Sequence, residues 1–202
     1  MATCRILLKN GYPIKKDPPA WERVILFTER QWRKLDLSVG DPWQAGLVEL
    51  FLNNGQDPLA SMTEDAVHLL TSHSKGFSKP EVGCKALHIA SFLGLSAVVE
   101  VLLHHGVDPN LPDAQGRTPL DYIVIGFENK FKTRADGFYG AAGLLATRGG
   151  CTHTTSEQQW KQFISTVGGE LLRHAIEASW RDPRDQGGKL PRLFRRIQDR
   201  FS

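Results

Sequence analysis

Residues 85–110 read KALHIASFLGLSAVVEVLLHHGVDPN, and LPDAQGRTPLDY continues the stretch to residue 122. Residues 87, 90 and 91 are apolar or small and fall on one side of a predicted first helix. A second helix carries a wider apolar stripe of Val98, Val99, Leu102 and Leu103. Gly94 separates the two helices where a left-handed turn favours glycine, and Gly106 stands where glycine commonly ends a helix. The pattern predicts two short antiparallel helices followed by an extended loop.

A third helix is predicted to begin after this loop, with Thr118 as its N-cap and Pro119 at its first position. As a whole the stretch resembles an ankyrin repeat, whose pattern is roughly G-x-T-P-L-H-x-A-A-x-x-G-H-x-x-V-V-x-L-L-L-x-x-G-A-D-x-N. It departs from that pattern at residues 85–86, where the family has Thr-Pro, and at Asp121, where the family has His. The residues in register are Leu87, His88, Ala90, Gly94, Val98, Val99, Leu102, Leu103, Gly106, Asp108 and Asn110.

The same helix-ending glycine occurs four times along the chain. Gly11, Gly55, Gly106 and Gly149 are 44, 51 and 43 residues apart, whereas ankyrin repeats are about 33 residues long. We therefore expect insertions, which cost little because loop-closure entropy rises only logarithmically with length. The resemblance implies an all-α fold, an ankyrin-type α-solenoid of about three to four helix-turn-helix repeats over residues 1–150. Because residues 1–11 supply only a second helix, we expect the chain to be the terminal part of a larger intracellular protein.

Within this array the return helices are predicted at residues 43–53 and 138–148, and a further first helix at 118–125. Residues 63–70 predict an added helix, and FENKFKTRADG at 127–137 is predicted to be an insertion. Residues 151–202 are predicted to be C-terminal capping helices followed by a basic amphipathic tail. The capping helix is expected to start at Thr155-Ser156 and to carry one long apolar stripe up to Ile176.

Composition indicates a soluble globular protein, with 41% hydrophobic and 23% charged residues among 202. The three cysteines are an odd number at irregular spacing, which favours reduced thiols in the cytoplasm or the nucleus over a disulfide framework. The net charge of +3 is concentrated in residues 181–202, which hold seven basic and three acidic residues. Only the tail is basic.

The sequence favours neither a metal site nor catalysis. Cys84 and His88 are four residues apart, with His68 and His73 upstream, but the spacing is looser than that of zinc sites. No serine lies in a G-x-S-x-G motif, and no glycine-rich loop follows a strand. We therefore predict no cofactor, no metal and no catalytic residues. An enzyme with scattered catalytic residues is the second alternative.

The function predicted from the resemblance is non-catalytic protein–protein recognition on a concave surface made of loop tips and first helices. The side chains expected to project there, and to bind a protein partner, are Phe92, Leu93, Asp113, Gln115, Arg117 and Tyr122. An exposed aromatic side chain in a groove often contributes much of the binding energy. For Phe92 and Leu93 the competing interpretation is the preferred one: the added helix near residues 66–70 folds over them and buries them.

The tail LPRLFRRIQDRF, at residues 190–201, places its apolar residues on one face and most of its arginines off that face. The preferred interpretation is a last helix packed on the cap with its arginines in water. The first alternative function is a peripheral membrane-associated adaptor, in which residues 190–202 bind an anionic membrane surface. Nucleic-acid binding is disfavoured, because the basic run is short and its aromatic residues lie on the apolar side.

Overall fold

The computed structural model describes residues 19–22, 24–25, 40–63, 83–130, 135–156, 158–159 and 162–163. In these ranges the regular structure is helical, and the only extended pairing is an isolated bridge between Ser61 and Lys85. No helix in these ranges is long and apolar enough to cross a membrane. The principal helices are α3 (Gly40–Asn53), α5 (Ala86–Phe92), α6 (Ser96–His104), α7 (Pro119–Lys130) and α8 (Ala135–Thr147).

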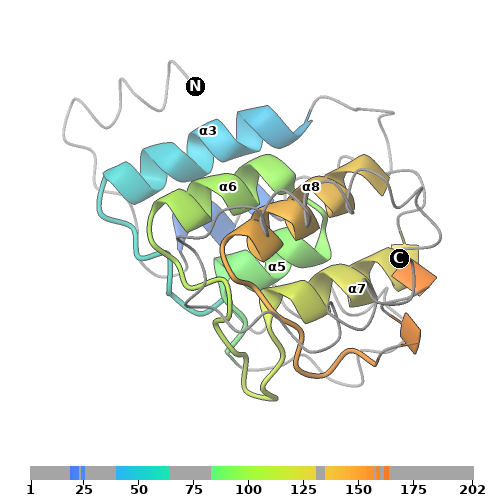
Figure 1. Cartoon of the computed structure of the whole chain (residues 1–202). Coiled ribbons are helices and arrows are strands. Elements are labelled where there is room, and N and C mark those ends of the chain that lie inside the picture. The colour runs from blue at the N-terminus through green and yellow to red at the C-terminus, as the bar shows by residue number, and fades with distance from the viewer. Residues whose placement is uncertain are drawn as a thin grey trace.

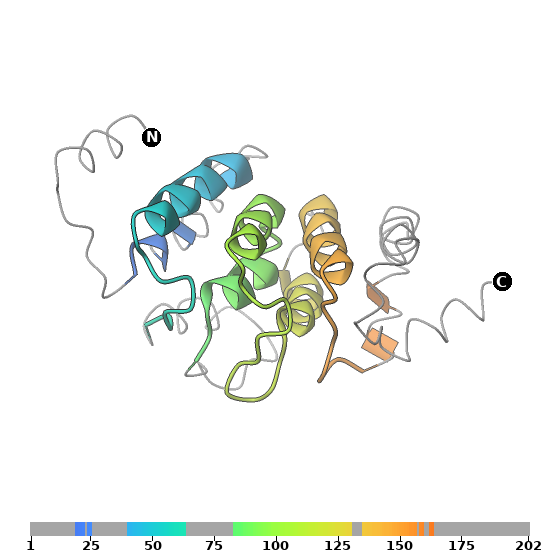
Figure 2. The same ribbon diagram turned by 60° about the vertical axis from the view of Figure 1, so that its left-hand side comes forward.

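The helices form two rows. Helices α3, α6 and α8 lie side by side in an outer row, in which α6 contacts both neighbours. Helices α5 and α7 pack against each other in an inner row, and each also contacts the outer helix that follows it in the chain. The loops that leave the outer helices all emerge on one side of the molecule (Figures 1 and 2).

The predicted glycine-ended helices are confirmed for three of the four positions. Gly55, Gly106 and Gly149 follow α3, α6 and α8 with φ of +84°, +80° and +80°, the left-handed region that favours glycine. Gly94 also has a positive φ, +65°, in the turn between α5 and α6. The fourth position, Gly11, lies outside the described residues.

Three predicted helix boundaries are corrected. The insertion predicted at residues 127–137 mostly extends the two helices on either side, because α7 continues to Lys130 and α8 already begins at Ala135. The side chain of Phe127 explains the longer α7, since it is buried against Phe138 and Phe163. Helix α3 begins at Gly40 and not at residue 43, with Pro42 in its first turn, where proline is tolerated.

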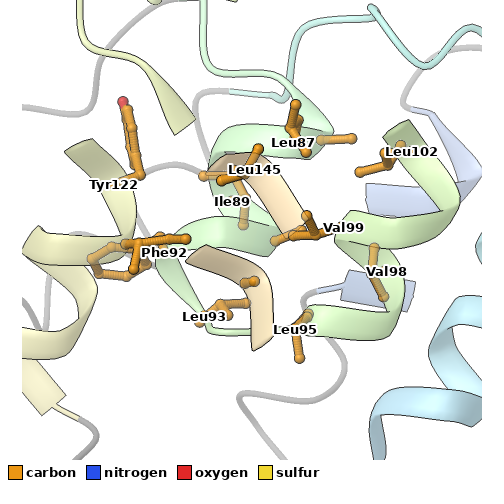
Figure 3. Packing of buried hydrophobic residues seen from close by; sticks show 14 of the residues in the cluster. Leu87, Ile89, Phe92, Leu93, Leu95, Val98, Val99, Leu102, Tyr122 and Leu145 are labelled. Atoms are coloured by element: carbon orange, nitrogen blue, oxygen red, sulfur yellow. The ribbon is translucent and has the colours of Figure 1, made fainter. Parts of the chain in front are cut away.

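The core lies between the two rows (Figure 3). All seven residues of α5 are buried, and α6 contributes Val98, Val99, Leu102 and Leu103. The predicted stripe of the second helix is therefore confirmed as a core stripe. The added helix predicted at 63–70, the capping stripe beyond residue 163, the half-repeat at 1–11 and the tail at 190–202 lie outside the described residues.

Replacing Leu102 with alanine is expected to lower the free energy of unfolding by about 2–5 kcal/mol, the usual cost of emptying a buried leucine site. Leu102 is fully buried between the rows, so neighbouring helices must either collapse or leave a cavity. Glu100→Ala, at an exposed position of the same helix, is the matched control and should change stability by less than about 0.5 kcal/mol. Urea denaturation of both variants measures the difference, and equal midpoints would contradict the buried stripe.

Candidate functional site

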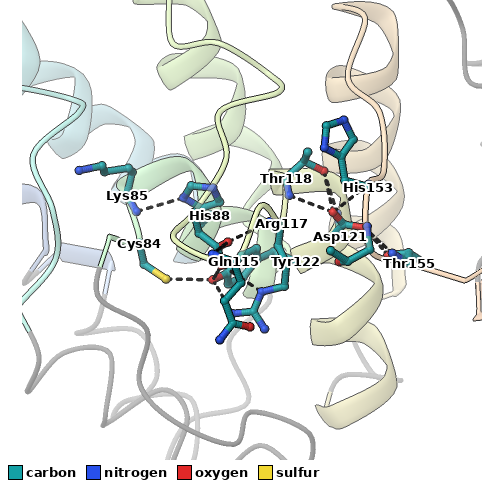
Figure 4. A network of polar contacts seen from close by, with 12 residues as sticks. Cys84, Lys85, His88, Gln115, Arg117, Thr118, Asp121, Tyr122, His153 and Thr155 are labelled. Carbon is teal, nitrogen blue, oxygen red and sulfur yellow. Dashed lines mark hydrogen bonds and ion pairs between the residues drawn. The ribbon is translucent and has the colours of Figure 1, made fainter.

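The loop between α6 and α7 is fixed by a buried polar cluster (Figure 4). Asp113 Oδ2 accepts hydrogen bonds from the Tyr122 hydroxyl at 2.7 Å and from Arg117 Nε at 2.9 Å. Its other oxygen accepts from the backbone N–H groups of Gln115 and Arg117, both at 2.8 Å. Since the Tyr122 proton is given to Asp113, the Cys84 thiol donates to the Tyr122 oxygen, 2.9 Å away.

This cluster is suited to structure and not to nucleophilic chemistry. Burial raises the pKa of the Cys84 thiol to about 11 and also raises the pKa of the Tyr122 phenol. Both groups are therefore protonated near neutral pH. A reactive cysteine, in contrast, would need to be a thiolate. The cluster instead joins the loop to the beginning of α5 and to α7, because Cys84 precedes one helix and Tyr122 belongs to the other.

His88 joins α5 to the same loop. Its Nδ1 accepts the backbone N–H of Lys85 at 3.1 Å, so its Nε2 carries the proton and donates to the carbonyl of Leu111 at 2.8 Å. Lys85 has no side-chain cap of its own, but this bond and the bridge to Ser61 hold its turn. Burial lowers the pKa of His88, so the neutral ring that both bonds require is favoured.

Asp121 has the corresponding role in α7, with a different chemistry. Its carboxylate accepts the N–H of Thr118 at 2.9 Å and the N–H groups of His153, Thr154 and Thr155 at 3.1, 3.1 and 2.8 Å. The Thr155 hydroxyl donates to it at 2.6 Å. Burial alone would raise the pKa of Asp121, but these hydrogen bonds outweigh burial and lower it. The Asp121 carboxylate therefore binds the loop after α8 through several hydrogen bonds.

A third buried residue repeats the arrangement. Glu22 is buried, and its two oxygens accept the N–H and the hydroxyl of Thr63 at 2.8 and 2.9 Å. Thr63 lies in the loop that follows α3. Thus Glu22, His88 and Asp121 each bind the loop that leaves the next outer helix, and all three loops are held at fixed positions.

These bonds predict a stability that falls in acid. His88 and Asp121 both have a folded-state pKa below their ordinary values of 6.5 and 3.8. The unfolded chain therefore binds protons more readily, and the stabilisation is present above the ordinary pKa and lost as the pH falls through the folded one. We expect the free energy of unfolding to decline first below about pH 6.5 through His88, and again below about pH 4 through Asp121.

Urea denaturation from pH 7.5 to pH 3 measures this profile. His88→Gln is the matched variant, because a glutamine side chain can accept from Lys85 and donate to Leu111 without titrating. Between about pH 6.5 and pH 4, the free energy of unfolding of this variant should depend less on pH than that of the wild type. Parallel profiles for the two proteins would exclude His88 as the source.

The structure corrects where most of the predicted site residues lie. Gln115 is exposed at the loop tip, as expected. The other five do not project, because α5 is enclosed by α6, α7 and α8, and because Tyr122 and its partners form the buried cluster described above. The buried residues are Phe92, Leu93, Asp113, Arg117 and Tyr122. Within the described ranges no group of three or more His, Cys, Asp or Glu residues could hold a metal ion, and His68 and His73 lie outside them.

Sequence reasoning missed two features of this side of the molecule. Leu59 is 46% exposed at the tip of the loop after α3, although the parallel Asp-Pro turns at residues 57–58 and 108–109 could have placed it. Glu22 and Thr63 were not predicted to interact. They are 41 residues apart, and no local pattern relates them.

Comparison with known proteins identifies the segment that builds this loop. Residues 82–114 match the family model of the ankyrin repeat. The chain contains an ankyrin repeat. It comprises α5, α6 and the first part of the loop that His88 and Asp113 fix, so His88 is the histidine of the ankyrin pattern.

Proteins that share the ankyrin repeat with this chain include three named as ARF GTPase-activating proteins. Human GIT1 is 46% identical over 46 residues, which are 23% of this chain and 6% of that protein. AGD4 of Arabidopsis thaliana is 43% identical over 49 residues, or 24% and 6%, and mouse GIT2 is 38% identical over 58 residues, or 29% and 8%. The chain thus matches less than a tenth of the length of these relatives.

Proposed function

We propose that this chain is a non-catalytic protein-recognition module that presents a row of rigid loop tips to a protein partner. The observation that carries the proposal is a repeated contact, in which Glu22, His88 and Asp121 each accept a hydrogen bond from, or donate one to, the loop that follows the next outer helix. Loops ordered before binding lose less entropy when a partner docks. Exposed side chains at their tips, including Leu59 and Gln115, are then available at fixed spacing.

We also propose that the helix rows belong to an ankyrin-type α-solenoid of three to four repeats over residues 1–150, with residues 151–202 as its cap. Three successive outer helices in contact, each ended by the same glycine turn, support the repeats. The packing of Phe163 against Phe127 and Tyr139 supports a cap on α7 and α8. A reducing compartment such as the cytoplasm suits the free thiols of Cys84 and Cys151.

The likeness to the GTPase-activating proteins is confined to the repeat and its surroundings. We therefore propose that the chain shares with them a recognition element and not the activity in their names. The partner proposed is a protein. Asp113, Arg117 and Tyr122 contribute indirectly in this proposal, because their hydrogen bonds set the position of the loop that carries Gln115. Phe92 and Leu93 contribute as part of the buried core.

The test is affinity capture with the intact chain and with a Leu59→Ala, Gln115→Ala double variant. Both side chains are exposed, so the variant should keep the stability of the wild type within about 0.5 kcal/mol. The variant lacks the apolar contact of Leu59 and the polar contact of Gln115, so its affinity for a captured partner should fall about tenfold or more. Glu100→Ala, exposed on the outer row, is the matched control and should bind as the wild type does. A partner that binds all three equally would refute recognition by the loop tips.

A further inference from the structure

The turns after α3 and α6 have the same backbone geometry. Asp57 and Asp108 each accept, at 2.8 Å, the N–H of the residue two positions later, which is Leu59 in one turn and Asn110 in the other. The turn after α8 shares a further feature with these two turns. In each of the three, the N–H of the residue that follows the glycine donates to a carbonyl five residues earlier. These bonds are Gln56 to Phe51, Val107 to Leu102 and Gly150 to Leu145, at 3.1, 3.2 and 2.8 Å. Leu59 and Asn110 therefore occupy equivalent positions.

Asn110 uses its side chain to join its own turn to the next one. Its Nδ2 donates to the carbonyl of Gly149 at 2.9 Å, and its Oδ1 accepts the N–H of Cys151 at 2.8 Å. A carboxamide can do both at once, because it carries a donor and an acceptor side by side. The turn after α6 and the turn after α8 are thus linked by the two hydrogen bonds of one carboxamide. We call such a link between successive turns a joint.

The preceding joint lacks this carboxamide. By the equivalence of the turns, the groups that correspond to the Gly149 carbonyl and the Cys151 N–H are the Gly106 carbonyl and the Asp108 N–H. Neither of these two groups has a hydrogen-bond partner in the part of the chain that the structure describes, and both residues are exposed. Leu59 stands where the carboxamide would originate, and its apolar side chain is 46% exposed.

We propose that the Gly106 carbonyl and the Asp108 N–H, with Leu59 beside them, bind the side-chain carboxamide of an asparagine or glutamine in an extended segment of a protein partner. A carboxylate has no donor for the Gly106 carbonyl, and an ammonium has no acceptor for the Asp108 N–H. A carboxamide has both, in the arrangement that Asn110 uses at the equivalent position. Leu59 offers the flanking residues an apolar contact. This inference rests on the proposed recognition function and gives one of its contacts a chemical identity.

The site can be tested by NMR on the ¹⁵N-labelled full chain, with acetyl-asparagine N-methylamide as the probe at millimolar concentrations. The amide signal of Asp108 should shift saturably with this probe and stay in place with acetyl-aspartate N-methylamide, which has nearly the same shape but no carboxamide. Leu59→Asn should fill the site from within, by analogy with Asn110. The Asp108 amide should then exchange more slowly with solvent, and the probe should bind about tenfold more weakly or worse, as expected for competition with two hydrogen bonds.

Leu59→Ala is the matched control, since it removes the same apolar side chain without supplying a carboxamide. It should leave Asp108 exchange fast and weaken binding of the probe less than Leu59→Asn does, because the Gly106 carbonyl and the Asp108 N–H both stay open. The site is overturned if the asparagine probe leaves Asp108 unmoved, if the aspartate probe moves it equally, or if Leu59→Asn does not slow its exchange. If the site is overturned but capture of a partner still depends on Leu59 and Gln115, the proposed function stands and only the carboxamide contact is excluded.

Discussion

Asp121→Ala is expected to lower the free energy of unfolding by about 3 kcal/mol or more, because several buried or half-buried donors lose their acceptor together. The carboxylate accepts backbone N–H groups from Thr118 and from all three residues 153–155, in addition to the Thr155 hydroxyl. Urea denaturation measures the total loss. Hydrogen exchange at residues 153–155 should show that the protection is lost first in the loop after α8.

Asp121→His separates the two roles of the carboxylate, which are to accept the N–H of Thr118 and to accept the N–H groups of residues 153–155. Histidine is the residue that the ankyrin pattern places here, and its Nδ1 could still accept the N–H of Thr118, as His88 accepts that of Lys85. Its Nε2–H, however, would face the N–H groups of residues 153–155, and donors cannot bond to donors. We therefore expect the variant closest to the family pattern to remain folded and to release the loop. If it is as stable as the wild type, the loop bonds contribute nothing measurable.

The contrast between the glycine turns and the recognition residues shows what the sequence could predict. Gly55, Gly106 and Gly149 were predictable because a helix end depends on a few adjacent residues, and glycine is favoured in the left-handed conformation. For Phe92 and Leu93 the sequence left two interpretations open, projection into a groove or burial, and the structure buries both side chains. Their surroundings depend on the extended α7 and on α8, which lie more than 25 residues further along the chain.

Asp121 illustrates the same limit from the other side. Its departure from the family pattern was visible in the sequence, but its partners were not, since they follow 32 to 34 residues later. Nothing near Asp121 indicates that a carboxylate must meet three successive N–H groups. Local patterns predict the elements, while the polar side chains that join one loop to the next depend on how those elements stack.

Gly126→Ala is expected to destabilise the protein by several kcal/mol, the opposite of the usual effect in a helix interior, where alanine is favoured over glycine by about 1 kcal/mol. A Cβ atom at position 126 would lie 2.1 Å from the carbonyl oxygen of Phe92 and 3.0 Å from Cε1 of Phe138. The first atom belongs to the backbone of α5 and cannot rotate away. Helices α5 and α7 would have to separate, and overpacking of this kind is costly.

The matched control is Gly55→Ala. That glycine has a φ of +84° and open space around its would-be Cβ, so alanine there meets only the backbone cost, about 1–2 kcal/mol. Thermal and urea denaturation of both variants should therefore rank Gly126→Ala as the more damaging, although only Gly55 has an unusual conformation. A Gly126→Ala protein as stable as the wild type would contradict the close approach of the inner helices. The spacing of the loops that Tyr122 and His88 hold depends on that approach, so the variant should also weaken a partner that binds the loop tips.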